Sequence, residues 1–114
     1  MRNKNEGFTL TEIMIVLLII GMVAAIAVPS FVQSRQTARR NICINNLRLI
    51  AAAKEQAALD NSFSETVVPI QADVLPYFKG GVMPLCPSNG SYTLNAINVN
   101  PVCSKSTSPD SHSL

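Results

Sequence analysis

The chain has 114 residues, of which 47% are apolar and only 14% are Asp, Glu, Lys or Arg, against about 25% charged residues in an ordinary soluble domain. This length allows one small domain and excludes a multidomain enzyme, and the low charge content disfavours a freely soluble monomer of the full chain. The net charge of +2 is too small to indicate nucleic acid as the main partner.

The N-terminal segment has the composition of a membrane-spanning helix. A short polar stretch, residues 1–7, precedes an apolar run from Ile13 to Val28, in which ten of sixteen residues are Ile, Leu or Val. These residues favour insertion into a bilayer by about 3–6 kcal/mol. A helix from Phe8 to Phe31 would be about 36 Å long, enough to cross a membrane. We therefore predict that residues 8–30 contact the lipid bilayer.

Two ordinary explanations of this segment are open. The first is a plain membrane anchor, but Glu12 lies at the edge of the apolar run with no Lys or Arg one turn away, and such a charge at membrane depth indicates a function. The second is a secretory signal, because Arg2 and Lys4 come first and Ala25-Ile26-Ala27 fits a cleavage site. Against it, helix-favouring sequence continues beyond Ala27.

The string from Gly7 to Glu12, GFTLTE, supports a third explanation. With the basic leader before it and the apolar run after it, this string resembles the class III signal of type IV pilins and type II secretion pseudopilins. The resemblance implies that a prepilin peptidase removes residues 1–7 between Gly7 and Phe8 and methylates the new N-terminus of Phe8. Glu12 and Pro29 then stand where the family keeps a glutamate and often a proline, whereas Thr11 is a mild departure from its usual Ile or Leu.

The resemblance also implies a structural rather than an enzymatic function. The chain is expected to be a single-pass inner-membrane protein that an assembly platform polymerises into a homo-oligomeric filament, either type IV pilus-like or a type II secretion pseudopilus, in the periplasm or at the cell surface. In the filament, the Glu12 carboxylate would pair with the Phe8 α-amine of a neighbouring subunit. The alternative is a non-polymerising single-pass inner-membrane anchor, or a small secreted protein cleaved after Ala27.

Helical sequence continues beyond the apolar run, over residues 31–61. Cys43, Leu47, Ile50 and Ala57 or Ala58 follow the spacing of an amphipathic stripe, whereas Lys54 falls elsewhere around the helix. Asp60 to Ser62 gives a stop signal.

Two features of this helix bear on its shape and its partners: a Gly and a Pro in the apolar half, and four arginines beyond it. Gly21 and Pro29 are expected to kink or loosen it. The arginines lack interleaved aromatic residues and do not share one face, so we expect no nucleic-acid binding by Arg35, Arg39, Arg40 and Arg48. A count of basic residues near the span favours the opposite membrane orientation from the motif, a conflict that the sequence leaves open.

We predict that residues 62–114 form a small C-terminal domain, called the head below. We expect a helical turn over residues 70–78, closed by Gly80-Gly81, then a turn over 87–90 and two strands over 91–97 and 101–103, followed by a polar tail. So small a sheet needs the face of the long helix for stability. The predicted fold is therefore α+β: a pilin-like long helix packed on a small antiparallel sheet.

Three cysteines leave one thiol over if a disulfide forms. Cys86 and Cys103 flank the predicted strands, and a bridge between them would contribute about 3 kcal/mol, with Cys43 as the alternative partner for either. Together with His112 they show no Cys-x-x-Cys pair, so no zinc site is predicted. Asp110 alone is too little for calcium. We expect no metal, no cofactor and no catalytic residue.

Overall fold

A computed structural model of the chain describes residue 4 and residues 6–106 and 111–114. Its elements are helix α1 (Leu10–Asn61), the short helix α2 (Gln71–Val74), the 3-10 turns η1 (Leu75–Tyr77) and η2 (Lys79–Gly81), and strands β1 (Tyr92–Thr93) and β2 (Val102–Cys103). A long N-terminal helix with a small antiparallel sheet confirms the predicted α+β fold. The chain forms two compact units, Met1–Ser34 and Arg35–Leu114, which are described separately below.

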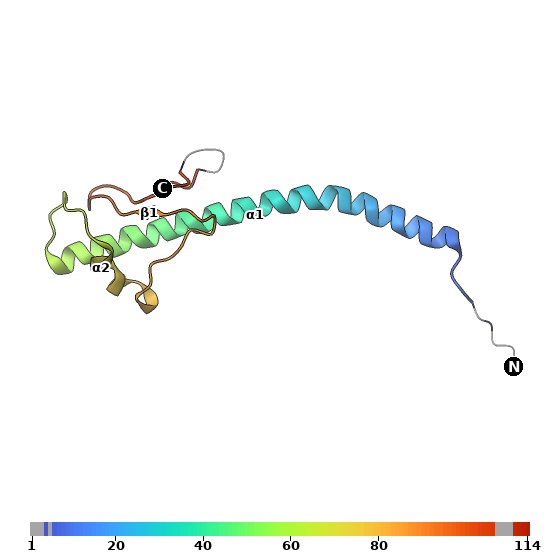
Figure 1. The fold of residues 1–114 in the computed structure, drawn as a ribbon, viewed down its shortest axis with the longest axis horizontal. Coiled ribbons are helices and arrows are strands. Elements are labelled where there is room, and N and C mark those ends of the chain that lie inside the picture. Colours follow the sequence, from blue (N-terminus) through green and yellow to red (C-terminus); the bar gives the residue numbers. More distant parts are fainter. Residues whose placement is uncertain (1–3, 5, 107–110) are drawn as a thin grey trace. The chain divides into compact units, whose positions relative to one another are not determined.

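The first unit holds the apolar part of α1, drawn from blue to cyan in Figure 1. A capping box sets its first turn: the Thr9 N–H donates to Glu12 Oε2 at 2.9 Å, and the Glu12 N–H donates to Thr9 Oγ1 at 3.2 Å. Every residue from Leu10 to Ser34 is exposed. The helix is long and apolar enough to cross a membrane, with a mean hydropathy of 2.8 over its most apolar window and none of that window buried.

The two residues predicted to kink or loosen the helix both lie within the continuous helix α1. Gly21 and Pro29 are both inside α1. Pro29 has no N–H to donate, so the Ala25 carbonyl lacks its usual helical donor, and Ser34 Oγ donates to the Ser30 carbonyl nearby at 2.9 Å. A kink or loosening of α1 at Gly21 and Pro29 stays a prediction.

The second unit is built on the C-terminal part of α1. The predicted stripe is confirmed, with Ala57 rather than Ala58 as its last member; its buried apolar residues are Cys43, Leu47, Ile50, Ala53 and Ala57. One end of the stripe packs with Cys86, Cys103 and the ring of Tyr92. The other end packs with Val74, Tyr77, Phe78 and Leu94. The core of the unit therefore lies along one face of α1, with Val74, Cys86 and Cys103 packed against it.

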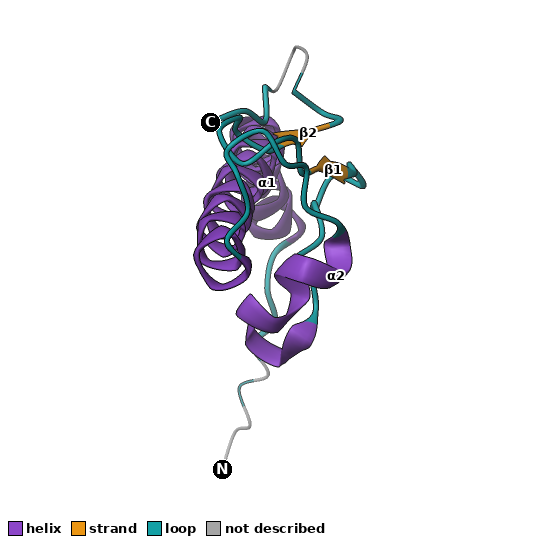
Figure 2. Ribbon diagram, turned by 90° about the vertical axis from the view of Figure 1, so that its left-hand side faces the viewer, coloured by secondary structure: helices purple, strands orange, loops and turns teal. Residues whose placement is uncertain are grey.

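The two strands are shorter than predicted. They pair antiparallel with Tyr92 opposite Cys103 and Thr93 opposite Val102, and Figure 2 shows them side by side. β1 does not extend to Ile97, because the Asn95 backbone has a φ of 56°, which extended strands do not adopt. The Asn95 side chain instead donates to the Asn100 carbonyl at 3.0 Å and holds the connecting loop.

The helical turn predicted over residues 70–78 is present as α2 and η1. Asp73 caps it by accepting the Ile70 N–H at 3.0 Å, and the Tyr77 hydroxyl donates to Asp60 Oδ2, near the end of α1, at 2.7 Å. Gly80 and Gly81 close the turn with φ values of 80° and 64°, which only glycine adopts without strain. This segment therefore leads the chain back along α1 toward Cys86.

Candidate functional site

The proposed cleavage site is open to an enzyme. Gly7 and Phe8 lie outside the helix, just before α1, and the Phe8 side chain is 87% exposed. A Cβ added at Gly7 would meet no atom within 4 Å. Residues 1–3 and 5 of the expected leader lie outside the described residues. Processing between Gly7 and Phe8 stays a prediction, which this accessibility favours.

Glu12 has a partner within its own chain, which the sequence did not predict. Its carboxylate accepts the Thr9 N–H through the capping box, and the side chain is exposed. A carboxylate can accept several hydrogen bonds, so the cap leaves room for an amine from another copy of the chain. Glu12 therefore has a structural function in the helix start, separate from the assembly function predicted for it.

The structure brings the three predicted disulfide candidates together. Cys43 comes from α1, Cys86 from the loop before the turn at residues 87–90, and Cys103 from β2, and all three are buried free thiols. His112 joins them with 2% of its surface exposed. The three Sγ atoms and a ring nitrogen of His112 all lie within 4.8 Å of one another. The absence of a Cys-x-x-Cys pair in the sequence therefore did not indicate which of these side chains lie close together in the fold.

Hydrogen-bond donors surround two of these sulfurs. The Tyr92 hydroxyl donates to Cys43 Sγ at 3.5 Å, and Asn46 Nδ2 donates to that hydroxyl at 3.1 Å. The backbone N–H groups of Ser88 and Gly90 donate to Cys86 Sγ. Such donors stabilise a thiolate over a thiol.

The pKa values of the two thiols are shifted in opposite directions. Burial raises the pKa of Cys43 to about 12, against the smaller lowering effect of Tyr92. Burial also raises the pKa of Cys86, but the two backbone donors with His112 and Cys43 outweigh it and lower that pKa to about 7. Of Cys43 and Cys86, Cys86 is therefore the thiol that ionises at the lower pH, and the thiolate is the form that binds metals.

The C-terminal segment is held in place by α1. Arg40 Nε donates to the Ser111 carbonyl at 2.9 Å, and the His112 N–H donates to the Lys105 carbonyl at 3.2 Å. The sequence predicted only that Arg40 binds no nucleic acid and that a polar tail follows residue 103, and neither pattern indicates this contact. Asp110, considered above for calcium, lies outside the described residues.

Lys54 is a second buried polar residue that the sequence did not single out. Only 1% of it is exposed, so the expectation that Lys54 falls off the stripe is wrong: it follows Ile50 by four residues and lies on the same face of α1. Its Nζ donates to the carbonyls of Leu94, Ala96 and Val99 at 2.5, 2.7 and 2.7 Å. Burial lowers the pKa of Lys54. Lys54 therefore ties α1 to the loop after β1.

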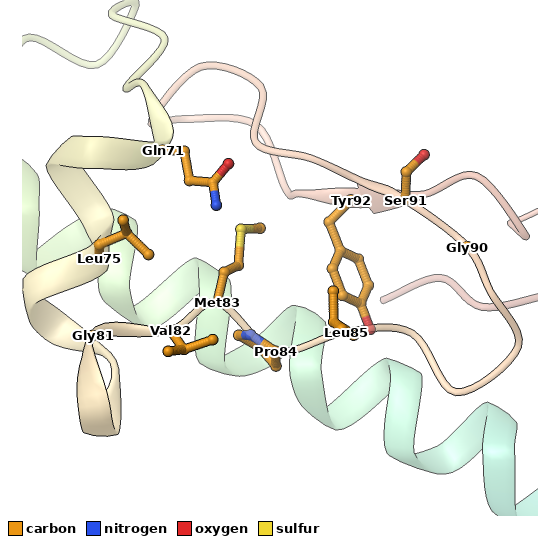
Figure 3. A pocket seen from close by; sticks show the side chains of 10 residues that line it. All are labelled: Gln71, Leu75, Gly81, Val82, Met83, Pro84, Leu85, Gly90, Ser91 and Tyr92. Atoms are coloured by element: carbon orange, nitrogen blue, oxygen red, sulfur yellow. The ribbon is translucent and has the colours of Figure 1, made fainter.

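A groove of about 520 Å³ lies beside β1 in the second unit. In Figure 3, Gln71 and Met83 lie close together at one end and Tyr92 lies beside Leu85 at the other. Gln71, Ser91 and Tyr92 are the residues with polar side chains among those that line it. The lining offers no carboxylate, imidazole or amine for acid–base chemistry, so we assign the groove no reaction.

Comparison with known proteins identifies the N-terminal segment. Residues 2–28 match the family model of the prokaryotic N-terminal methylation motif. This match confirms the resemblance predicted from the string between Gly7 and Glu12.

Individual relatives are similar to this chain over a longer segment than the family model. The type II secretion system core protein G of Pseudomonas aeruginosa is 38% identical over 60 residues, which are 53% of this chain and 42% of that protein. The type IV major pilin protein PilA of Myxococcus xanthus is 40% identical over 52 residues, 46% of this chain and 24% of its own length. The core protein G of Escherichia coli is 34% identical over 59 residues, 52% of this chain and 41% of its own. The chain thus spans less than half the length of these curated relatives. No solved structure gives a significant match.

Proposed function

We propose that the chain is a structural subunit of a filament, either a type IV pilus-like fibre or a type II secretion pseudopilus. A prepilin peptidase removes residues 1–7 and methylates Phe8. The subunit is then held in the inner membrane by the apolar part of α1 and polymerised by the assembly platform. The methylation motif over residues 2–28 supports this function, as do relatives named as a pilin and as core protein G of type II secretion.

One structural observation carries the proposal. The described residues from Leu10 to Ser34 bury no side chain, although they include large apolar residues at nearly every turn. A surface of this kind is stable in lipid, or against copies of itself that replace the lipid contacts. The adjoining motif distinguishes the two uses, because a plain anchor needs no cleavable leader. We therefore expect storage in the membrane followed by assembly.

The mature N-terminus tests this function directly. Mass spectrometry of the protein extracted from its native membranes is expected to show N-methylated Phe8 as the first residue. A chain beginning at Val28 would show a secreted protein cleaved after Ala27, and one beginning at Met1 a plain anchor; either would contradict the proposal.

A glycine pair supplies the matched variants. Gly7→Val is expected to block processing, because the peptidase would have to accommodate a branched side chain beside the scissile bond. Gly21→Val is expected to be processed normally. An added Cβ meets no atom within 4 Å at either position, so a difference between the two variants reports recognition rather than misfolding. Equal processing of both variants would contradict cleavage after Gly7.

A further inference from the structure

All of the cysteines and the sole histidine of the sequence meet at one point of the fold. They come from four separate segments: α1, the loop before the turn at 87–90, β2 and the C-terminal segment. Cys43, Cys86, Cys103 and His112 are each 5% exposed or less. Packing of a hydrophobic core does not by itself explain why all of these Cys and His side chains lie together. Burial of an imidazole among thiols in particular costs free energy unless the imidazole has a polar partner or a metal.

The spacing of these groups fits a tetrahedral metal ion. Zinc–sulfur bonds of about 2.3 Å at tetrahedral angles place two sulfur ligands about 3.8 Å apart, and a sulfur and a nitrogen about 3.6 Å apart. Cys86 Sγ lies 3.7 Å from His112 Nδ1, and all four ligand atoms lie within 4.8 Å of one another. A contraction of about 1 Å or less would complete the coordination shell.

The surroundings fit the same ion. Backbone N–H groups of Ser88 and Gly90 point at Cys86 Sγ, and the Tyr92 hydroxyl points at Cys43 Sγ, in the manner of groups that orient and charge-stabilise metal ligands. Gly90 lets the turn approach closely: a Cβ there would lie 2.7 Å from Cys103 Sγ and 3.2 Å from Cys86 Sγ.

We propose that Cys43, Cys86, Cys103 and His112 form a structural zinc site. Three thiolates and an imidazole are a common zinc ligand set, and their burial leaves no open coordination position for a substrate. The ion would fasten the loop, β2 and the C-terminal segment to α1, the stabilisation that so small a head needs. A disulfide between two of these cysteines would use two of the four groups and leave a buried thiol and imidazole without a function. The inference does not depend on the filament function.

The first test counts metal and thiols in the unaltered protein. The full chain is extracted from membranes in detergent without reductant, using an affinity tag that contains no histidine. Elemental analysis is expected to find about one equivalent of zinc. The three thiols should resist a maleimide reagent until a chelator removes the metal. If one thiol reacts both with and without the chelator, and three react after reduction, two of the cysteines form a disulfide and the proposal is overturned. Three thiols with equal reactivity in the presence and absence of zinc would overturn it as well.

The second test uses variants and a spectroscopic probe. Co²⁺ added to the chelated protein is expected to produce the thiolate charge-transfer and visible bands of a tetrahedral site, which Cys86→Ser and His112→Gln should change or abolish. Tyr92→Phe should still bind the ion, with affinity reduced by about 10- to 100-fold. Ser111→Ala, beside His112, is the matched control and should bind as the unaltered chain does. Unchanged cobalt spectra in both ligand variants would overturn the assignment.

Discussion

Glu12 closes the first turn of α1, and the assembly function proposed for it makes a second demand on the same side chain. In the free chain it closes the first turn of α1 by accepting the Thr9 N–H, an interaction that any good hydrogen-bond acceptor could supply. Pairing with the Phe8 α-amine of a neighbouring subunit, by contrast, requires a negative charge. A buried charge pair that loses one member costs about 3–5 kcal/mol, so the proposed assembly function would be the more demanding of the two.

Two substitutions at Glu12 separate these functions. Glu12→Gln keeps the acceptor of the cap and loses the charge, whereas Glu12→Ala loses both. We expect normal cleavage of both variants, and at least about a tenfold loss of filaments in both, because 1.4 kcal/mol already corresponds to a factor of ten. Electron microscopy and sedimentation of sheared filaments measure the loss. Normal filaments from Glu12→Gln would reduce Glu12 to a helix cap.

At the scale of elements, Lys54 joins α1 to the loop that follows β1. Three backbone carbonyls converge on its Nζ, and these carbonyls belong to a segment that leaves the strand pattern at Asn95. The buried ammonium thus takes the place of strand pairing for the loop. A hydrogen bond from a charged donor contributes about 1.5–3 kcal/mol, more than a neutral one.

Replacing this donor should loosen the second unit. Lys54→Met keeps the length of the side chain but leaves the carbonyls of Leu94, Ala96 and Val99 without their donor, so we expect a loss of about 2–4 kcal/mol in unfolding free energy. Tyrosine fluorescence measures it during denaturation, because both tyrosines lie in the second unit and the chain has no tryptophan.

An exposed lysine provides the control for that measurement. Lys79→Met makes the same chemical change at an exposed position and is expected to alter the unfolding free energy by about 0.5 kcal/mol or less. Equal stability of the two variants would contradict the function assigned to Lys54.

At the scale of the whole molecule, the two units differ in what stabilises them. The unit of residues 35–114 buries its own apolar stripe. The apolar residues of the unit of residues 1–34 are exposed wherever the structure describes them, as the proposed contact with lipid or with other subunits requires. We therefore expect that the proposed membrane insertion and assembly can be disturbed by changes in the first unit without unfolding the second.

Ile19→Arg tests this division. An arginine at the centre of the apolar run costs about 2.5–3.5 kcal/mol on insertion, where the isoleucine is favourable by about 0.3–0.6 kcal/mol. We expect the variant to lose most of its alkali-resistant membrane fraction and all filaments, while its thiol count and tyrosine fluorescence stay unchanged. Val82→Arg, at an exposed position of the second unit, should behave as the unaltered chain. Retention of Ile19→Arg in the membrane would contradict a spanning function for this helix.

Much of the fold could be predicted from local pattern. The apolar run, the end of α1 near Asn61 and the stripe through Cys43, Leu47 and Ile50 follow from residue type and helical periodicity, which act over a few turns. The motif between Gly7 and Glu12 is likewise contiguous, so the sequence alone indicated it and the match over residues 2–28 confirmed it.

Tertiary structure decided which distant groups meet. The early end of β1 follows from the left-handed backbone at Asn95, and the burial of Lys54 follows from the loop that folds over it. The meeting of Cys43, Cys86, Cys103 and His112 depends on the path of the whole second unit, including the contact between Arg40 and Ser111 that holds the C-terminal segment. Periodicity and spacing report on neighbours along the chain, whereas a four-ligand cluster is set by the packing of segments far apart in it.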